Sequence, residues 1–148
     1  MKNEANNMVK IGDYELPDDL YYHEKHTWAK VEGEKVRVGI DAIGLAIAGK
    51  IVFIRMKKLG KEIAAGKSLG TAEAGKGVIP ITAPITGEII ELNPEVDKRN
   101  TKLLNEDPYG AGWIAILKPT GNLEEELKQL ISGDKIKEWG EEELKQLE

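Results

Sequence analysis

The sequence predicts a mainly β fold, a flattened barrel or sandwich with one short internal helix and helices at the C-terminus. Three observations lead to this prediction. Short runs of alternating or β-branched residues recur between turn residues, which is typical of sandwiches and barrels. Sixteen glycines and six prolines supply the turns. The heptapeptide EEELKQL, which favours helix, occurs only near the C-terminus, at 124–130 and 141–147.

The elements follow from local patterns along the chain. Residues 1–13 are polar and are expected to form a flexible N-terminal tail, and residues 14–22, which contain Pro17, are expected to be irregular. The runs at 26–32 and 35–40 alternate around Gly33 and predict a β-hairpin. Residues 41–49 predict a short helix that Asp41 caps and Gly49 ends.

The second half of the chain predicts further strands and then helices. Strands are expected at 51–57, 68–72, 78–83, 87–92 and 112–118, with a loop and a helical turn over 95–107. Asn122, with Glu125 three residues later, predicts a helix N-terminus, and a second helix is expected after Asp134. The domain organisation expected is therefore a tail at 1–13, a β domain at 14–121 and a helical segment at 122–148.

Composition limits the function. The formal net charge of −5 argues against a nucleic-acid partner, because such proteins need a basic face. No apolar run is as long as a membrane span, and the N-terminus lacks the apolar core of a signal peptide, so we expect a cytoplasmic protein. The chain has no cysteine, which excludes disulfides and protein thiolates. Any thiol chemistry must come from a cofactor.

The sequence lacks recognisable motifs for catalysis or metal binding. The two histidines, His23 and His26, are three residues apart, and on an extended segment they would point to opposite faces. No further ligand is suitably spaced, so we expect no metal site. There is no nucleophile elbow, phosphate loop or dinucleotide fingerprint, which favours a carrier or binding module over an enzyme.

Lys76 lies at the tip of an expected hairpin. Gly75 and Gly77 flank it, and Glu73 precedes it by three residues. Glycines leave a tip residue sterically unencumbered, so the primary amine is well displayed for covalent modification. An isolated turn lysine is more often merely solvated, so this interpretation depends on the rest of the chain.

Several motifs resemble the glycine cleavage system H-protein family, which carries lipoyl groups. They include His26-Thr27-Trp28, the segment from Glu73 to Glu88, and Asn105 to Trp113. The resemblance covers about residues 26–119 and implies a lipoyl-domain-like barrel-sandwich hybrid. It also implies lipoic acid attached to Lys76 as N6-lipoyllysine, with Glu73, Gly75 and Gly77 as flanking recognition residues.

The resemblance implies a non-catalytic component of glycine decarboxylation. The lipoyl-lysine arm would carry the aminomethyl group of glycine from glycine decarboxylase, the P protein, to the aminomethyltransferase, the T protein. Dihydrolipoamide dehydrogenase, the L protein, would reoxidise the arm, and a lipoyl ligase or transferase would attach it.

Thr27 departs from the family pattern, which usually has a glutamate there to help hold the loaded arm. Two alternatives to the aminomethyl carrier therefore stay open. One is a related lipoate-binding protein that carries sulfur in a heterodisulfide-reductase-like sulfur-oxidation pathway. The other is an unmodified binding or scaffold protein that kept the fold.

Overall fold

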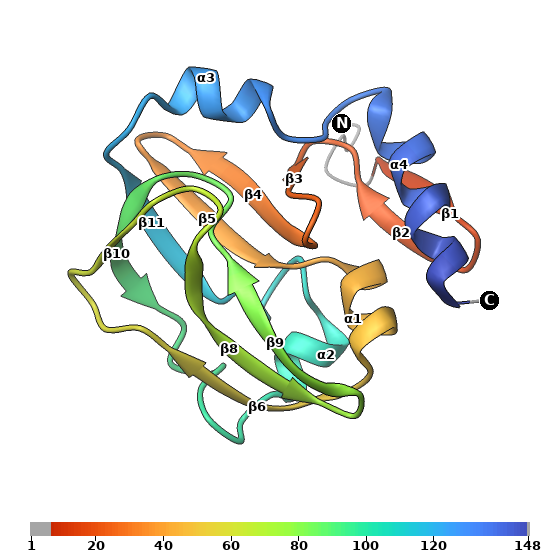
Figure 1. Ribbon diagram of the computed structural model, residues 1–148, viewed down its shortest axis with the longest axis horizontal. Coiled ribbons are helices and arrows are strands. Elements are labelled where there is room, and N and C mark those ends of the chain that lie inside the picture. Colours follow the sequence, from red (N-terminus) through yellow and green to blue (C-terminus); the bar gives the residue numbers. More distant parts are fainter. Residues whose placement is uncertain (1–6, 148) are drawn as a thin grey trace, which may run out of the picture.

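The computed structural model describes residues 7–147, and the fold is mainly β (Figure 1). Its strands are β1 (Met8–Ile11), β2 (Tyr14–Pro17), β3 (Tyr21–Tyr22), β4 (Thr27–Glu32), β5 (Lys35–Ile40), β6 (Ile51–Met56), β7 (Glu62–Ile63), β8 (Ser68–Ala74), β9 (Gly77–Thr82), β10 (Gly87–Leu92) and β11 (Ala115–Pro119). Its helices are α1 (Ala42–Ala48), α2 (Lys102–Glu106), α3 (Leu123–Lys128), α4 (Lys135–Leu144) and the 3-10 turn η2 (Lys145–Leu147).

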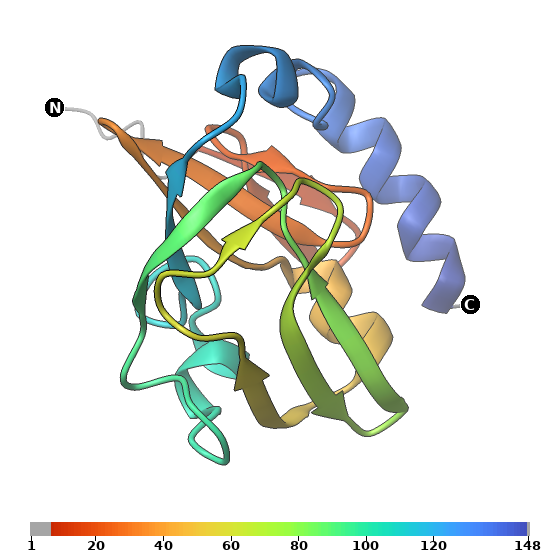
Figure 2. The same ribbon diagram turned by 60° about the vertical axis from the view of Figure 1, so that its left-hand side comes forward.

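Two antiparallel sheets form the body of the molecule. A six-stranded sheet has the order β3-β4-β5-β11-β10-β7, and a three-stranded sheet has the order β6-β8-β9. Figures 1 and 2 show the smaller sheet facing the larger one, and neither closes into a barrel. Val38 from β5 and Ile54 and Leu69 from the smaller sheet are fully buried in the core between them. The prediction of a mainly β sandwich with an internal helix is confirmed.

A second, smaller core joins the two ends of the chain. The hairpin β1–β2, α1 and α4 surround Ile11, Leu16, Trp28 and Ile136, all fully buried. Ile11 packs so closely against α4 that a methyl group added at Gly140 would overlap its side chain. The C-terminal helix therefore holds the N-terminal hairpin in place.

Two expectations for the first 22 residues are wrong. Met8–Ile11 forms strand β1 rather than part of a flexible tail, and 14–22 contains β2 and β3 rather than irregular chain. These strands, of four, four and two residues, are too short to show a clear alternating pattern. They form because β1 pairs with β2, β3 pairs with β4, and α4 covers their apolar face. Residues 1–6 lie outside the described part of the chain.

The helix over 41–49 forms where the sequence predicts it. The Asp41 carboxylate accepts a hydrogen bond from the backbone N–H of Gly44 at 2.8 Å and so caps the first turn. Gly49 ends the helix with φ of 90°, a conformation that favours glycine. The helix thus stops directly beside the β8–β9 turn.

The C-terminal helices also form as predicted. Asn122 caps α3 by accepting from the Glu125 N–H at 3.1 Å, whereas Asp134 makes no capping hydrogen bond to α4. Leu127 and Leu130 pack on the main core, and Trp139 and Leu144 pack on the smaller one. Within residues 7–147, no helix combines the length and apolarity needed to cross a membrane.

Candidate functional site

The hairpin β8–β9 presents Lys76 to solvent. Ala74 pairs with Gly77, so Gly75 and Lys76 form a two-residue turn, and the lysine side chain is exposed. Gly77 adopts φ of 127°, which side-chain-bearing residues rarely adopt. The Lys76 N–H donates to the carbonyl oxygen of Ala48 at 3.2 Å. The end of α1 therefore fixes the turn while the amine stays free.

Glycine packing brings the turn close to α1. A methyl group at Gly49 would lie 3.5 Å from the Gly75 backbone nitrogen, so the two backbones are almost in contact. Glu73 lies on β8 opposite Val78, exposed on the strand that leads into the turn. The structure thus places Glu73, Gly75, Lys76 and Gly77 in one hairpin. Their role in attaching and recognising a lipoyl group stays a prediction.

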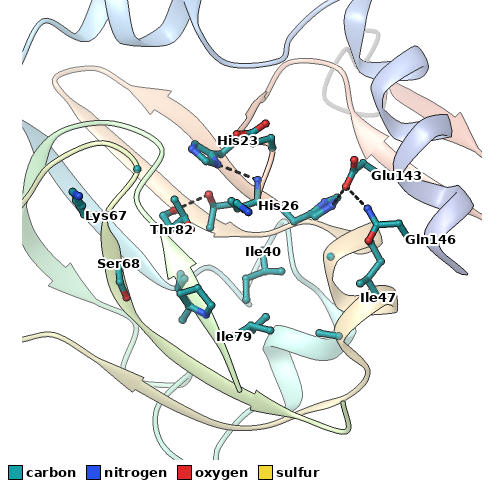
Figure 3. Close-up of a pocket in the computed structure, with 18 of the residues that line it drawn as sticks. His23, His26, Ile40, Ile47, Lys67, Ser68, Ile79, Thr82, Glu143 and Gln146 are labelled. Carbon is teal, nitrogen blue, oxygen red and sulfur yellow. Dashed lines mark hydrogen bonds and ion pairs between the residues drawn. The ribbon is translucent and has the colours of Figure 1, made fainter. Parts of the chain in front are cut away.

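A cleft of about 910 Å³ begins at Lys76 and runs between β9, β4 and α1 (Figure 3). Ile47 and Ile79 line the part nearest the hairpin tip, and Ile40, the strand partner of Thr27, lies farther in. β9 then leads from the lysine turn to Thr82, where the lining becomes polar. The cleft therefore has an apolar near end and a polar far end.

Neutral groups form the floor of the far end. The buried Thr27 hydroxyl donates to the Thr82 carbonyl oxygen at 2.7 Å. The Ser68 hydroxyl donates to the Gly70 carbonyl oxygen at 2.7 Å. Among the described lining residues, only Glu24 and Glu143 carry carboxylates; Glu24 is exposed, and Glu143 is bonded to His26.

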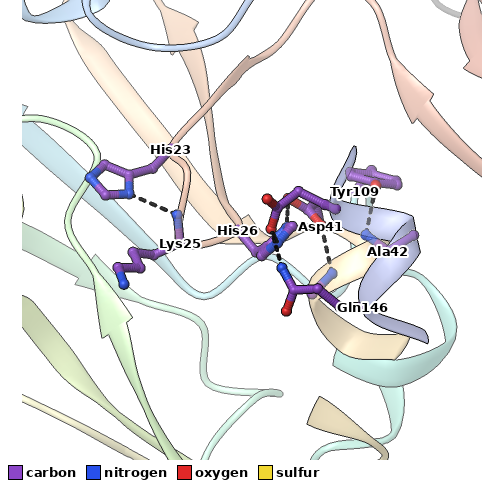
Figure 4. Close-up of polar contacts among 9 residues, drawn as sticks. His23, Lys25, His26, Asp41, Ala42, Tyr109 and Gln146 are labelled. Carbon is purple, nitrogen blue, oxygen red and sulfur yellow. Dashed lines mark hydrogen bonds and ion pairs between the residues drawn. The ribbon is translucent and has the colours of Figure 1, made fainter. Parts of the chain in front are cut away.

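One wall consists of a histidine between two carboxylates (Figure 4). His26 adopts φ of 75°; its Nδ1 lies 3.1 Å from both oxygens of the buried Asp41, and its Nε2 lies 2.8 Å from Glu143 Oε1. Burial alone lowers the pKa of His26, but hydrogen bonds and Coulombic attraction from Asp41 and Glu143 outweigh it and raise the pKa. When both ring nitrogens carry a proton, the imidazolium donates to both carboxylates.

His23 lies in the same cleft, and the prediction that the two histidines point to opposite faces is wrong. Residues 23–26 form a tight turn in which the His26 N–H donates to the His23 carbonyl oxygen at 2.8 Å, so strand alternation does not apply. The Lys25 N–H donates to His23 Nδ1 at 3.0 Å. Burial lowers the pKa of His23, and Glu24 opposes this only in part. The neutral ring therefore carries its proton on Nε2.

Sequence reasoning missed Glu143 and Gln146, which reach the cleft from the second EEELKQL copy. In both copies, the third glutamate bonds to a residue outside the C-terminal helices. The third glutamate of the first copy, Glu126, accepts hydrogen bonds from the backbone and hydroxyl of Thr86 at 2.8 and 2.6 Å. The third glutamate of the second copy, Glu143, holds His26. The one signal in the sequence was the leucine after each of these glutamates, Leu127 and Leu144. Both leucines pack inward, which places the neighbouring glutamates near the body of the protein.

The described residues, 7–147, contain no cluster of three or more His, Asp or Glu side chains that could hold a metal ion. The buried carboxylate Asp41 is used for the helix cap and for His26. The arrangement displays one exposed amine at the mouth of a long cleft. Such a geometry suits a tethered group better than a bound substrate.

The chain is similar to glycine cleavage system H proteins by three comparisons. The family model for the glycine cleavage H-protein matches residues 20–143. A "Glycine cleavage system H protein 2" of Aquifex aeolicus is 46% identical over 144 residues, covering 90% of this chain and 88% of that protein. A "Probable glycine cleavage system H protein 2" of Sulfurisphaera tokodaii is 45% identical over 130 residues, covering 85% and 86%.

Further matches agree with these. A "Probable glycine cleavage system H protein" of Pyrococcus abyssi is 42% identical over 133 residues, covering 89% of this chain and 97% of that one. The crystal structure of a glycine cleavage system H protein from Mycobacterium marinum superposes with a TM-score of 0.64 at 34% identity, covering 77% and 98%. The fold, the lysine hairpin and these matches agree: the chain belongs to the glycine cleavage H-protein family, a family of lipoyl carriers.

Proposed function

We propose that the protein is a non-catalytic carrier with lipoic acid joined to the Nζ of Lys76 as an amide. The observation that carries this proposal is the exposed Lys76 amine at the mouth of the cleft. The bound group would supply the dithiol–disulfide chemistry, which the cysteine-free chain lacks. The protein would supply position, exposure and partner recognition.

The residues of the cleft fit such an arm. Ile40, Ile47 and Ile79 can cover an aliphatic chain that starts at Lys76, because apolar surfaces exclude water from methylenes. The polar groups begin at Thr82, near the far end of β9, about 17 Å from Gly77 at a rise of about 3.3 Å per residue. The arm's long chain would therefore place its sulfur atoms toward the polar end.

Within this role, we propose that the arm carries the aminomethyl group of glycine. The group would pass from glycine decarboxylase (P protein) to the aminomethyltransferase (T protein), and dihydrolipoamide dehydrogenase (L protein) would restore the oxidised arm. Tethering to Lys76 would raise the local concentration of the arm at each docked partner. Membership of the glycine cleavage H-protein family supports this assignment.

Attachment is tested by intact mass. The protein is incubated with a lipoate-protein ligase, ATP and lipoic acid, beside the variants Lys76→Arg and Lys61→Arg. Lys61 is a matched control because it is also an exposed lysine that follows a glycine. We expect one lipoyl increment on the native chain and on Lys61→Arg, and none on Lys76→Arg. An increment retained by Lys76→Arg would refute the assignment of the site.

The cargo is tested by loading. Lipoylated protein is mixed with glycine decarboxylase, pyridoxal phosphate and glycine labelled with ¹³C at C2. Accumulation of the labelled one-carbon amine on the arm, measured by mass, would support the aminomethyl carrier. Absence of the adduct, with decarboxylase shown to be active on another H protein, would refute it.

A second candidate function is a carrier of sulfur in a heterodisulfide-reductase-like sulfur-oxidation pathway. One observation favours it: at position 27, where the family pattern has a carboxylate, the cleft has the neutral Thr27 hydroxyl, which already donates to the Thr82 carbonyl oxygen. Incubation of the lipoylated protein with thiosulfate or persulfide should then add sulfur to the arm. A mass unchanged by either donor would exclude this candidate.

A further inference from the structure

Free hydrogen-bond donors gather at the far end of the cleft. Lys25 and Lys67 line the cleft, are exposed, and make no side-chain ion pair with any described residue. The backbone of Lys25 occupies Nδ1 of His23, which leaves the Nε2–H of the neutral ring as a donor. His23, Lys67 and Thr82 all line the cleft, and Figure 3 shows them on the side away from Ile47 and Glu143.

The negative groups of the cleft are placed differently. Glu143 lies against His26 and Gln146, both of which bond to its Oε1, at 2.8 and 3.0 Å. Figure 3 shows this cluster on the opposite wall from Lys67. Glu24 is the only other described carboxylate that lines the cleft, and it is exposed on the His23 turn. The end of the cleft that contains Lys67 therefore has donors and positive charge with which to bind an anion.

We propose that His23 and Lys67 form a seat for the thiolate of the reduced arm, in which the His23 Nε2–H donates to sulfur and Lys67 supplies positive charge. The proposal rests on lipoylation of Lys76. In the step itself an S–H bond breaks, the electron pair stays on sulfur and the proton goes to solvent. No electrons are transferred and no co-reactant is needed.

Such a seat would change the reactivity of the arm thiols and would not affect the attachment of the arm to Lys76. The thiolate, and not the thiol, is the reactive form of a sulfur nucleophile. A hydrogen bond and an opposite charge both favour the charged form and so lower a thiol pKa. The negative charge of Glu24 disfavours the thiolate, so removal of that charge should lower the thiol pKa further. His23 and Lys67 would thus be positioning residues for whatever cargo the arm carries.

The experiment measures the pKa of the arm thiols directly. Protein with a lipoyl increment verified by mass is reduced with a phosphine, which is then removed. It is alkylated with iodoacetamide at pH 6 to 10, and the initial rates are read from intact mass. Because the chain contains no cysteine, the arm supplies the only thiols. Free dihydrolipoamide is the reference, and thermal melts verify that each variant is folded.

We expect the more acidic thiol to have a pKa about 0.5 to 1 below that of free dihydrolipoamide. Lys67→Gln and His23→Ala should each slow alkylation at pH 7 about two- to threefold. His23→Gln, which keeps an N–H donor, should recover part of the rate. Glu24→Gln should accelerate alkylation, and Lys61→Gln, outside the cleft, should leave it unchanged. Salt at 1 M should weaken the contribution of Lys67.

Two outcomes would overturn the proposal. One is a thiol pKa equal to that of free dihydrolipoamide. The other is a lowered pKa that neither Lys67→Gln nor His23→Ala raises. Both are distinct from failure of the proposed function, which would appear earlier as the absence of a lipoyl increment on Lys76.

Discussion

Replacement of Glu143 by glutamine tests how the C-terminal helix is held to the cleft wall. The substitution keeps the shape of the side chain but removes the charge opposite His26 Nε2, 2.8 Å away. The two side chains are 23% and 11% exposed, so solvent screens the pair only in part. A charge-assisted hydrogen bond in this setting contributes about 1 to 2 kcal/mol to the free energy of unfolding. For a chain of 148 residues this lowers Tm by roughly 3 to 6 °C.

The loss should depend on pH in a defined direction. The folded-state pKa of His26 is raised above its ordinary value of about 6.5. The stability that this pairing contributes is therefore fully present below about pH 6.5 and is lost as pH rises through the folded pKa. Glu143→Gln removes one cause of the raised pKa. Its deficit relative to the native chain should be largest near pH 6 and should shrink toward pH 9.

Urea unfolding at pH 6, 7.5 and 9 measures the effect, and histidine NMR titration gives the two pKa values. Glu141→Gln is the matched control, because Glu141 lies on the same helix and pairs with Lys137 at the exposed surface. We expect the control to change stability by less than about 0.5 kcal/mol. A Glu143→Gln deficit that is independent of pH, or equal to that of the control, would refute the role of the His26 ion pair.

Three further outcomes concern the cleft and the hairpin. Thr27→Val removes the donor to the Thr82 carbonyl oxygen and should lower the free energy of unfolding by about 1 to 2 kcal/mol, measured in urea. Gly70→Ala would force a methyl group into the carbonyl oxygen of Arg55 and should cost about 1 to 3 kcal/mol in the same assay. Gly75→Ala meets open space at a φ outside the positive range, so it should change the free energy of unfolding in urea by less than about 0.5 kcal/mol.

Strong local signals were sufficient for several elements. The alternation around Gly33 predicted the β4–β5 hairpin, because a strand with one buried face must alternate. The Asp41 cap and Gly49 predicted α1, and Asn122 predicted the start of α3. By contrast, β1, β2 and β3 were missed. These short strands are stabilised by pairing partners and by the apolar face of α4, which no local pattern reveals.

The candidate site, too, could be predicted from the sequence only in part. Glu73, Gly75, Lys76 and Gly77 are neighbours in sequence, so the hairpin that displays the lysine was predictable. The cleft was not, because its walls join residues far apart along the chain. His26 and Glu143, for example, are separated by 117 positions and meet only when α4 packs on the N-terminal hairpin.

The sequence by itself determined the mainly β class, the exposed lysine and the absence of any protein thiol, because these depend on residue type and near neighbours. Tertiary structure decided the electrostatics of the cleft. The turn at 23–26 brought both histidines to one cavity, where strand alternation would have separated them. The return of the C-terminal helix supplied Glu143, which together with Asp41 raises the pKa of His26. Burial and long-range pairing fix these charges, and neither is encoded in any local stretch of the chain.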